Sequence, residues 1–126
     1  MALELGMRGE SSAIVDDART AAAFGAGGVR VFGTPALVGL MENAAWQLVQ
    51  PELADGETTV GTVVNVRHLA ATPVGERVTA MAELVEIDGR RLVFRVTATD
   101  EHQLIGEGTH ERARVQLERF LARLQR

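Results

Sequence analysis

Three polar side chains have the types and positions that acid–base or nucleophilic chemistry would need, and the first is Glu42. It lies in the segment TPALVGLMENAAW, where Leu40, Met41 and Ala44 surround it with apolar groups. A carboxylate in apolar surroundings needs a cation or a hydrogen-bond donor close by. Glu42 is therefore a candidate nucleophile or general base. The alternative is that it lies on a helix face that reaches solvent.

His68 and Thr34 are the other two candidates. His68 follows a valine-rich segment and precedes LAATP, which places it near the end of a predicted strand. An imidazole there can face a cleft and act as a general base or proton shuttle. Thr34 precedes Pro35, a pattern that favours a helix start with the threonine as N-cap. For both residues a purely structural role stays open at this level.

Two further residues have positions that suggest contact with a ligand. Gly61 interrupts a strand of valine and threonine, which indicates a β-bulge or a close approach of the backbone to a ligand. Arg112 shares its strand face with Gly108 and His110, because side chains two apart on a strand point the same way. We expect Arg112 to point inward, towards the helix.

The composition argues against several other kinds of function. The 126-residue chain has no cysteine, which excludes disulfide, zinc-thiolate and thiol-nucleophile chemistry. A net charge of −4 argues against nucleic-acid binding. No GxSxG elbow, P-loop or dinucleotide fingerprint occurs, and the three histidines lack metal-site spacing, so we expect no metal. Without a signal peptide or an apolar membrane span, we expect a cytoplasmic protein that does not bind membranes.

Hydrophobic periodicity indicates the elements that must carry these residues. The length predicts one domain over residues 1–126. After a weak first strand at residues 8–17, a helix begins at Thr34, is apolar around most of its circumference, and is closed by Pro51. The period then changes to two. The remaining predicted elements are strands at 58–69, 76–87, 90–100 and 104–115 and a short helix at 117–126.

The element order is a strand, one long helix and four strands in an antiparallel meander. A helix that is apolar on all sides must be wrapped by a curved sheet, and a five-stranded sheet leaves an edge exposed. We therefore predict the α+β class and the hotdog fold, an antiparallel five-stranded sheet wrapped around a long central helix. The exposed edge predicts a homodimer joined edge to edge, with tetramers as a further option.

Four stretches of the chain resemble the hotdog-fold acyl-CoA thioesterases of the fluoroacetyl-CoA thioesterase-like family. They are TPALVGLMENA, VGTVVNVRHLAATPVGERVTAMAEL, DGRRLVFRV and IGEGTHERARVQLERF, and the likeness spans about residues 33–121. The resemblance implies an acyl-CoA thioesterase with coenzyme A as part of the substrate and no retained cofactor. It also implies a catalytic group at Thr34, Glu42 and His68, a substrate-contacting glycine at Gly61 and an arginine near the reacting group at Arg112.

The likeness is poor upstream of Phe32. The fluoroacetyl-specific enzyme of this family carries an aromatic-rich lid there, whereas this chain has FGAGGVRV. Gly25, Gly27 and Gly28 cannot supply such a lid. An ordinary small or medium acyl thioester is therefore the expected substrate.

The spacing of Thr34 and Glu42 poses a geometric problem. They are eight residues apart, which is about 12 Å along a continuous helix. The helix could begin later, Thr34 could act on a distinct part of the substrate, or the site could draw residues from both subunits; we favour the last. Three other functions stay open: a module that binds an acyl thioester or another small ligand without hydrolysing it, a hydratase or dehydratase of the same fold, and a structural protein.

Overall fold

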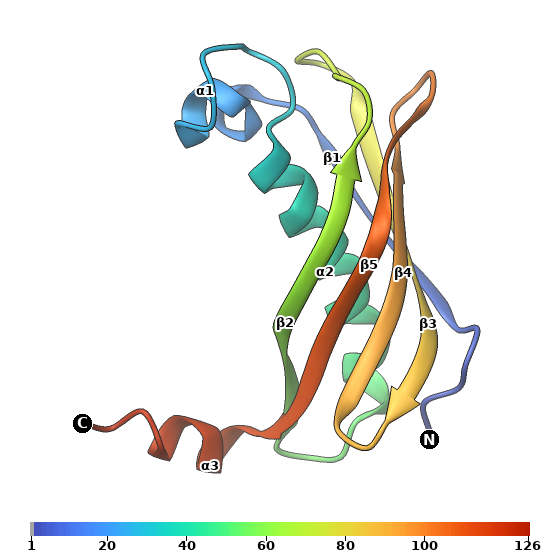
Figure 1. The fold of residues 1–126 in the computed structure, drawn as a ribbon, viewed down its shortest axis with the longest axis vertical. Helices are drawn as coiled ribbons and strands as arrows, with labels where there is room; N and C mark the ends of the chain where they lie inside the picture. The colour runs from blue at the N-terminus through green and yellow to red at the C-terminus, as the bar shows by residue number, and fades with distance from the viewer. Residues whose placement is uncertain (1) are drawn as a thin grey trace.

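The predicted α+β architecture is confirmed by a computed structural model, which describes residues 2–126 (Figure 1). The strands are β1 (Arg8–Ile14), β2 (Glu57–His68), β3 (Arg77–Asp88), β4 (Arg91–Thr99) and β5 (Leu104–Gln116). The helices are α1 (Ala21–Phe24), α2 (Thr34–Val49) and α3 (Leu117–Ala122), with single 3₁₀ turns η1 (Asp17–Arg19) and η2 (Gln50–Glu52). Over residues 2–126, no helix combines the length and apolarity that crossing a bilayer requires.

The strand order corrects one prediction. The sheet runs β1-β3-β4-β5-β2, so β3, β4 and β5 form a meander but β2 pairs with β5 at the sheet's edge. The turn after Asp88 is short enough to fix β3 beside β4, whereas residues 69–76 form a longer link that leaves β3 free to pair elsewhere. Pairing β2 with β5 places Gly61 directly opposite Arg112.

The core lies between one face of α2 and the inner face of the sheet. The buried face of α2 consists of Leu37, Met41, Ala44, Ala45 and Val49. It packs on a strand face whose inward positions include the small residues Ala80 and Ala82. The expectation that the helix is enclosed on all sides is wrong for a single chain, because Trp46 keeps 38% of its surface exposed. The sheet of one chain covers only part of the circumference of α2.

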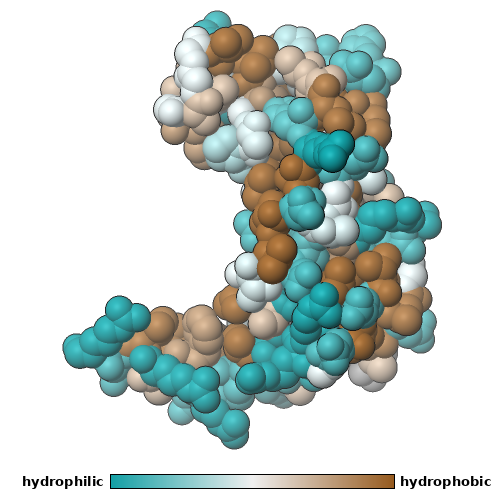
Figure 2. All heavy atoms as spheres, in the orientation of Figure 1, coloured by the Kyte–Doolittle hydropathy of each residue, from teal (hydrophilic) through white to brown (hydrophobic). Residues whose placement is uncertain are grey.

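The edge strand β2 lies open along its middle. Residues 61–65 are all exposed, and Val63 and Val64 keep 41% and 44% of their surface accessible. Figure 2 shows the molecule hollowed on this side, between the end that carries α1 and the end that carries α3, with hydrophobic residues along the floor of the hollow. An uncovered strand edge with apolar side chains can pair with a strand of another chain.

Candidate active site

Glu42 projects from the middle of α2 towards β2 and β5. Its Oε2 accepts a hydrogen bond from Arg112 Nη1 at 3.3 Å, and its side chain is 39% exposed. Arg112 is 7% exposed and points towards the helix, as predicted. Thr59 fixes the other side of the guanidinium, where Nε donates to Oγ1 at 2.8 Å and Nη2 to the carbonyl at 3.1 Å. A half-buried carboxylate therefore faces a cation whose position is set by the sheet.

Gly61 provides the space that the carboxylate occupies. A Cβ on Gly61 would overlap Glu42 Oε2 and would come within 3.4 Å of Arg112 Nη1. The strand also shifts register between Gly61 and Val63, which confirms the predicted bulge. The group that approaches the backbone at Gly61 is the Glu42 side chain of the same chain, and contact of Gly61 with a ligand stays a prediction.

Thr34 contacts His68 at the other end of the site. Thr34 Oγ1 lies 2.8 Å from His68 Nδ1, which joins the start of α2 to the end of β2. The prediction that Thr34 is the N-cap is wrong: Gly33 occupies that position, Thr34 is the first helical residue, and no side chain caps the helix. The physical reason is that the threonine hydroxyl is directed at the imidazole instead of the backbone N–H groups.

The surroundings of His68 keep its imidazole neutral and leave one ring nitrogen unpaired among the described residues. Its Nε2 is buried and has no hydrogen-bond partner among residues 2–126, and the edge of its ring packs on Phe32 with ring centroids 6.4 Å apart. Burial lowers the pKa of His68 below its ordinary value of 6.5, so the imidazole is neutral at pH 7. Because a hydroxyl both donates and accepts, Thr34 is compatible with either tautomer of His68.

A cavity of about 320 Å³ opens beside the Thr34–His68 pair. Its lining is formed by Ala21, Val31, Phe32, Thr34, His68, Leu69, Ala70 and Ala71. Glu42 does not belong to this lining. The carboxylate instead lies beside Gly61, and the seven residues of β2 from there to His68 span about 20 Å. One chain thus builds the predicted residues into two separate groups.

His110 belongs to the Glu42 group, although the sequence did not single it out as a site residue. It is 1% exposed, and its Nε2 lies 3.1 Å from Arg112 Nη1 and 3.8 Å from Glu42 Oε2. The signal that could have found it is its spacing, since residues 110 and 112 share one face of β5. Its location beside an arginine that holds a carboxylate is visible only once β2 and β5 are paired.

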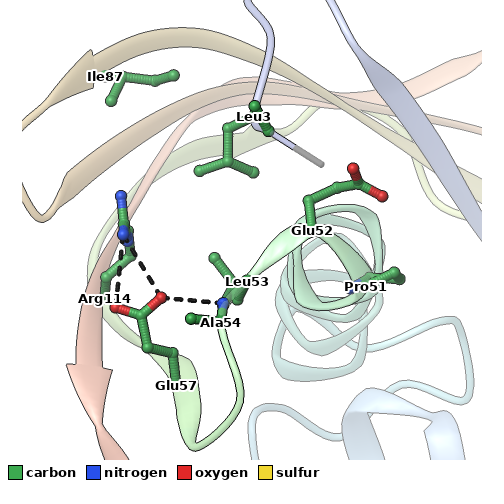
Figure 3. A pocket seen from close by; sticks show the side chains of 9 residues that line it. Leu3, Pro51, Glu52, Leu53, Ala54, Glu57, Ile87 and Arg114 are labelled. Atoms are coloured by element: carbon green, nitrogen blue, oxygen red, sulfur yellow. Dashed lines mark hydrogen bonds and ion pairs between the residues drawn. The ribbon is translucent and has the colours of Figure 1, made fainter.

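A larger cavity, of about 620 Å³, lies at the end of the sheet where β2 begins (Figure 3). It is bounded by Leu3, the segment after α2 and an ion pair between Arg114 and Glu57 at 3.4 Å. No histidine, serine or threonine lines it. Its carboxylates, Glu52 and Glu57, have no imidazole in the lining to carry protons, so volume alone does not identify the site.

Comparisons with known proteins point to one family. A family model for fluoroacetyl-CoA-specific thioesterases matches residues 15–118. A fluoroacetyl-CoA thioesterase from Streptantibioticus cattleyicolor is 50% identical over 94 residues, which cover 75% of this chain and 68% of that protein.

Solved structures agree with the sequence matches. The fluoroacetyl-CoA thioesterase FlK has a TM-score of 0.94 and 40% identity, covering 99% of this chain and 97% of that one. A thioesterase superfamily member from Thermus thermophilus has a TM-score of 0.90 and 30% identity, covering 97% and 90%. The predicted hotdog fold and the resemblance seen in the sequence are both confirmed.

Proposed function

The chain belongs to the fluoroacetyl-CoA-specific thioesterase family and is a thioester hydrolase, and we propose that Glu42, His68 and Thr34 are the residues with which it hydrolyses an acyl-CoA. The observation that supports the proposal most strongly is that Gly61 and Arg112 together accommodate the Glu42 carboxylate. Glu42 Oε2 occupies the space that a side chain at position 61 would fill, and the buried Arg112 supplies the opposite charge. A merely solvated glutamate would need neither.

Glu42 acts on the carbonyl carbon of the thioester in one of two ways. As a nucleophile it forms a C–O bond, the C–S bond breaks, and water then hydrolyses the resulting mixed anhydride. As a base it takes a proton from water, whose oxygen attacks the same carbon. Both routes end in a carboxylic acid and free coenzyme A thiol. Since Oε2 makes both observed contacts, Oε1 is the oxygen we assign to the reaction.

His68 moves the protons that this reaction requires. The departing thiolate needs a proton, and the neutral imidazole with its unpaired Nε2 is suited to relay one. In the base route the proton that Glu42 takes from water passes through His68 to the thiolate, which returns Glu42 to its ionised form. In the nucleophile route His68 takes a proton from the water that hydrolyses the anhydride and gives it to the thiolate released in the first step. Thr34 orients the ring through Nδ1 and accommodates the change of tautomer.

Charge that develops on the thioester oxygen needs donors placed in advance. We assign that role to the backbone N–H of Gly61, with Arg112 adding positive charge nearby. The assignment is supported by the register shift between Gly61 and Val63, which interrupts the pairing of β2 with β5 at this point. Because Gly61 has no side chain, this part of the strand also stays accessible.

We propose that a homodimer brings the two groups together. If β2 pairs antiparallel with β2 of a second copy about an axis between Val64 and Asn65, His68 of one copy lies opposite Gly61 of the other. The imidazole then reaches the Glu42 group across the interface. The exposed valines at the middle of β2 and the hollow beside them support this arrangement (Figure 2). Further pairing into tetramers and a cytoplasmic location stay predictions.

The acyl group that we propose is small or medium and unsubstituted. The cavity beside His68, about 320 Å³, has alanine at three of its lining positions and lies at the lower end of the usual range for ligand pockets. The segment before Phe32 is rich in glycine and carries only Phe24 as an aromatic residue, itself 49% exposed. Such a segment offers little with which to select a fluorinated acyl group.

The test is thiol release from a panel of acyl-CoA thioesters of increasing chain length, with fluoroacetyl-CoA included. We expect turnover of short unsubstituted thioesters, no preference for fluoroacetyl-CoA over acetyl-CoA, and loss of turnover in Glu42→Ala and His68→Ala. Tight binding of these thioesters with no turnover above the two variants would show a binding module instead of an enzyme. Loss of an enoyl chromophore without thiol release would show a hydratase.

A further inference from the structure

His110 is a buried imidazole with no role in the reaction as described so far. It lies on β5, opposite Val64 of β2 and Phe94 of β4 in the strand registers, and its ring stacks on Phe94 at a centroid distance of 6.1 Å. At 1% exposure both ring nitrogens must find partners inside the protein. Those partners define what the side chain does.

The hydrogen bonds of His110 fix its tautomer. Nδ1 lies 2.7 Å from the carbonyl oxygen of Val63, which can only accept, so Nδ1 carries the proton. Nε2 then presents a lone pair, and Arg112 Nη1, which can only donate, lies 3.1 Å from it. Burial lowers the pKa of His110, and the Arg112 charge acts in the same direction, so this neutral form is the one present at pH 7.

This tautomer directs Arg112 at Glu42. The Nη1 group has two N–H bonds; one points to His110 Nε2 and the other to Glu42 Oε2 at 3.3 Å. Thr59 holds Nε and Nη2 from the opposite side. We infer that His110 is a positioning residue for Glu42: as a hydrogen-bond acceptor it fixes the Arg112 fork that holds the carboxylate against Gly61.

Protonation of His110 would undo this arrangement. An imidazolium Nε2–H would oppose the N–H of Arg112 and would turn to Glu42 Oε2, 3.8 Å away. The charged and titratable groups around the ring are Glu42 from α2 and Arg112 and Glu111 from β5, while β2 contributes the Val63 carbonyl and β4 the uncharged Phe94. Glu111 is held in an ion pair with Arg91. Only Glu42 is therefore left to change partner.

Two amide substitutions separate the two ring nitrogens of His110. His110→Gln places a carbonyl oxygen near the position of Nε2 and keeps an acceptor for Arg112. His110→Asn places an N–H near the position of Nδ1 and keeps the bond to Val63, but it removes the acceptor. We expect His110→Gln to stay within about threefold of the wild-type kcat and His110→Asn to lose on the order of 10- to 100-fold, with KM changed less than kcat. Equal losses in the two variants would overturn the inference.

The inference rests on the proposed role of Glu42, so the same pair is measured in a Glu42→Gln background. There we expect the two His110 variants to differ by less than about twofold, because the carboxylate that His110 positions is already gone. If Glu42→Gln itself leaves thiol release intact, it is the proposed function that fails. If Glu42→Gln strongly lowers turnover and the two His110 variants still differ to the same extent in the turnover that remains, His110 acts elsewhere and the inference fails.

A measurement on the unaltered protein covers the case in which a variant does not fold. Nitrogen-15 NMR of the histidine rings at pH 7 distinguishes the two neutral tautomers. We expect His110 to be protonated at Nδ1 with an unprotonated Nε2. A ring protonated at Nε2, or at both nitrogens, would show that it cannot accept from Arg112 and would overturn the inference.

Discussion

The Thr34–His68 pair and the Glu42–Arg112 pair each have one member on α2, but they differ in how many hydrogen bonds hold them. Arg112 makes four hydrogen bonds, to the hydroxyl and the carbonyl of Thr59, to His110 and to Glu42. His68 makes one side-chain hydrogen bond, to Thr34, and its Nε2 has no partner in the described chain. The guanidinium of the Glu42–Arg112 pair is therefore held by several hydrogen bonds, whereas His68, which lines a cavity, keeps an unpaired nitrogen.

The difference follows from what each group has to do. A charge is most effective when its partners are in place before the reaction, so that nothing must reorganise. A proton carrier instead needs an unoccupied nitrogen and a pKa close to the working pH. The chain thus fixes the carboxylate and leaves the imidazole free, and about 20 Å of β2 separates them within one subunit.

Removing the unpaired Nε2 of His68 has the largest expected effect and tests its role as the proton carrier. His68→Asn keeps an amide near the position of Nδ1, and so the contact with Thr34, but it eliminates Nε2. We expect kcat for thiol release to fall on the order of 10²- to 10⁴-fold, the usual size of a lost acid–base group. Thermal unfolding within a few degrees of the wild type would show that the fold is intact. Turnover above a tenth of the wild-type value would mean that His68 is not the proton carrier.

Filling the space at Gly61 tests the Glu42–Arg112 pair. Gly61→Ala places a methyl group where Glu42 Oε2 lies, and only a flexible side chain has to move, so the fold should survive. We expect kcat to fall on the order of 10- to 100-fold because the carboxylate is displaced from Arg112. The control is the same substitution combined with Glu42→Gln, which should add no loss beyond that of Glu42→Gln alone. A fully active Gly61→Ala variant would contradict the need for this space.

Changing Thr34 tests how much His68 depends on its one side-chain partner. Thr34→Val has nearly the same shape and lacks the hydroxyl, whereas Thr34→Ser retains it. We expect Thr34→Val to lower kcat about fivefold and Thr34→Ser to stay close to the wild type, because a single neutral hydrogen bond contributes about 1 kcal/mol. Equal activity of the two variants would show that the 2.8 Å contact does not orient the ring.

The smallest expected effect concerns pH. Burial lowers the pKa of the His68 imidazole below 6.5, so its neutral form persists as the pH falls to that value and is lost only below it. We therefore expect the decline of kcat/KM on the acid side to have its midpoint below pH 6.5. An imidazole with an ordinary pKa would already lose half of its neutral form at pH 6.5. A profile with that earlier decline would contradict the desolvated position of His68.

Hydrophobic periodicity was sufficient to predict every strand and the long helix. It could not identify the neighbour of β2, because alternation defines the faces of a strand and not its partner. Without the β2–β5 pairing, most contacts of the site could not be predicted either. Once β2 lies beside β5, Gly61 comes opposite Arg112 and Glu42 fits between them.

The residues of the site were found more readily than their contacts. Glu42 and His68 stand out from their apolar surroundings, but the sequence could not show that the nearest imidazole to Glu42 is His110. Thr34 was predicted as a cap because the residue before a proline at a helix start usually has that role. Its contact with His68 depends on how the helix start packs against the end of β2, which is a tertiary effect.

The central claim is that Glu42 of one subunit and His68 of another form one site, and mixing inactive variants tests it directly. Glu42→Ala and His68→Ala are co-expressed with different affinity tags, and the heterodimer is isolated. Each heterodimer then has one site with both groups intact, so we expect about half of the wild-type turnover, although each parent is inactive. A heterodimer no more active than its parents would contradict the claim and would require both groups to act within one chain.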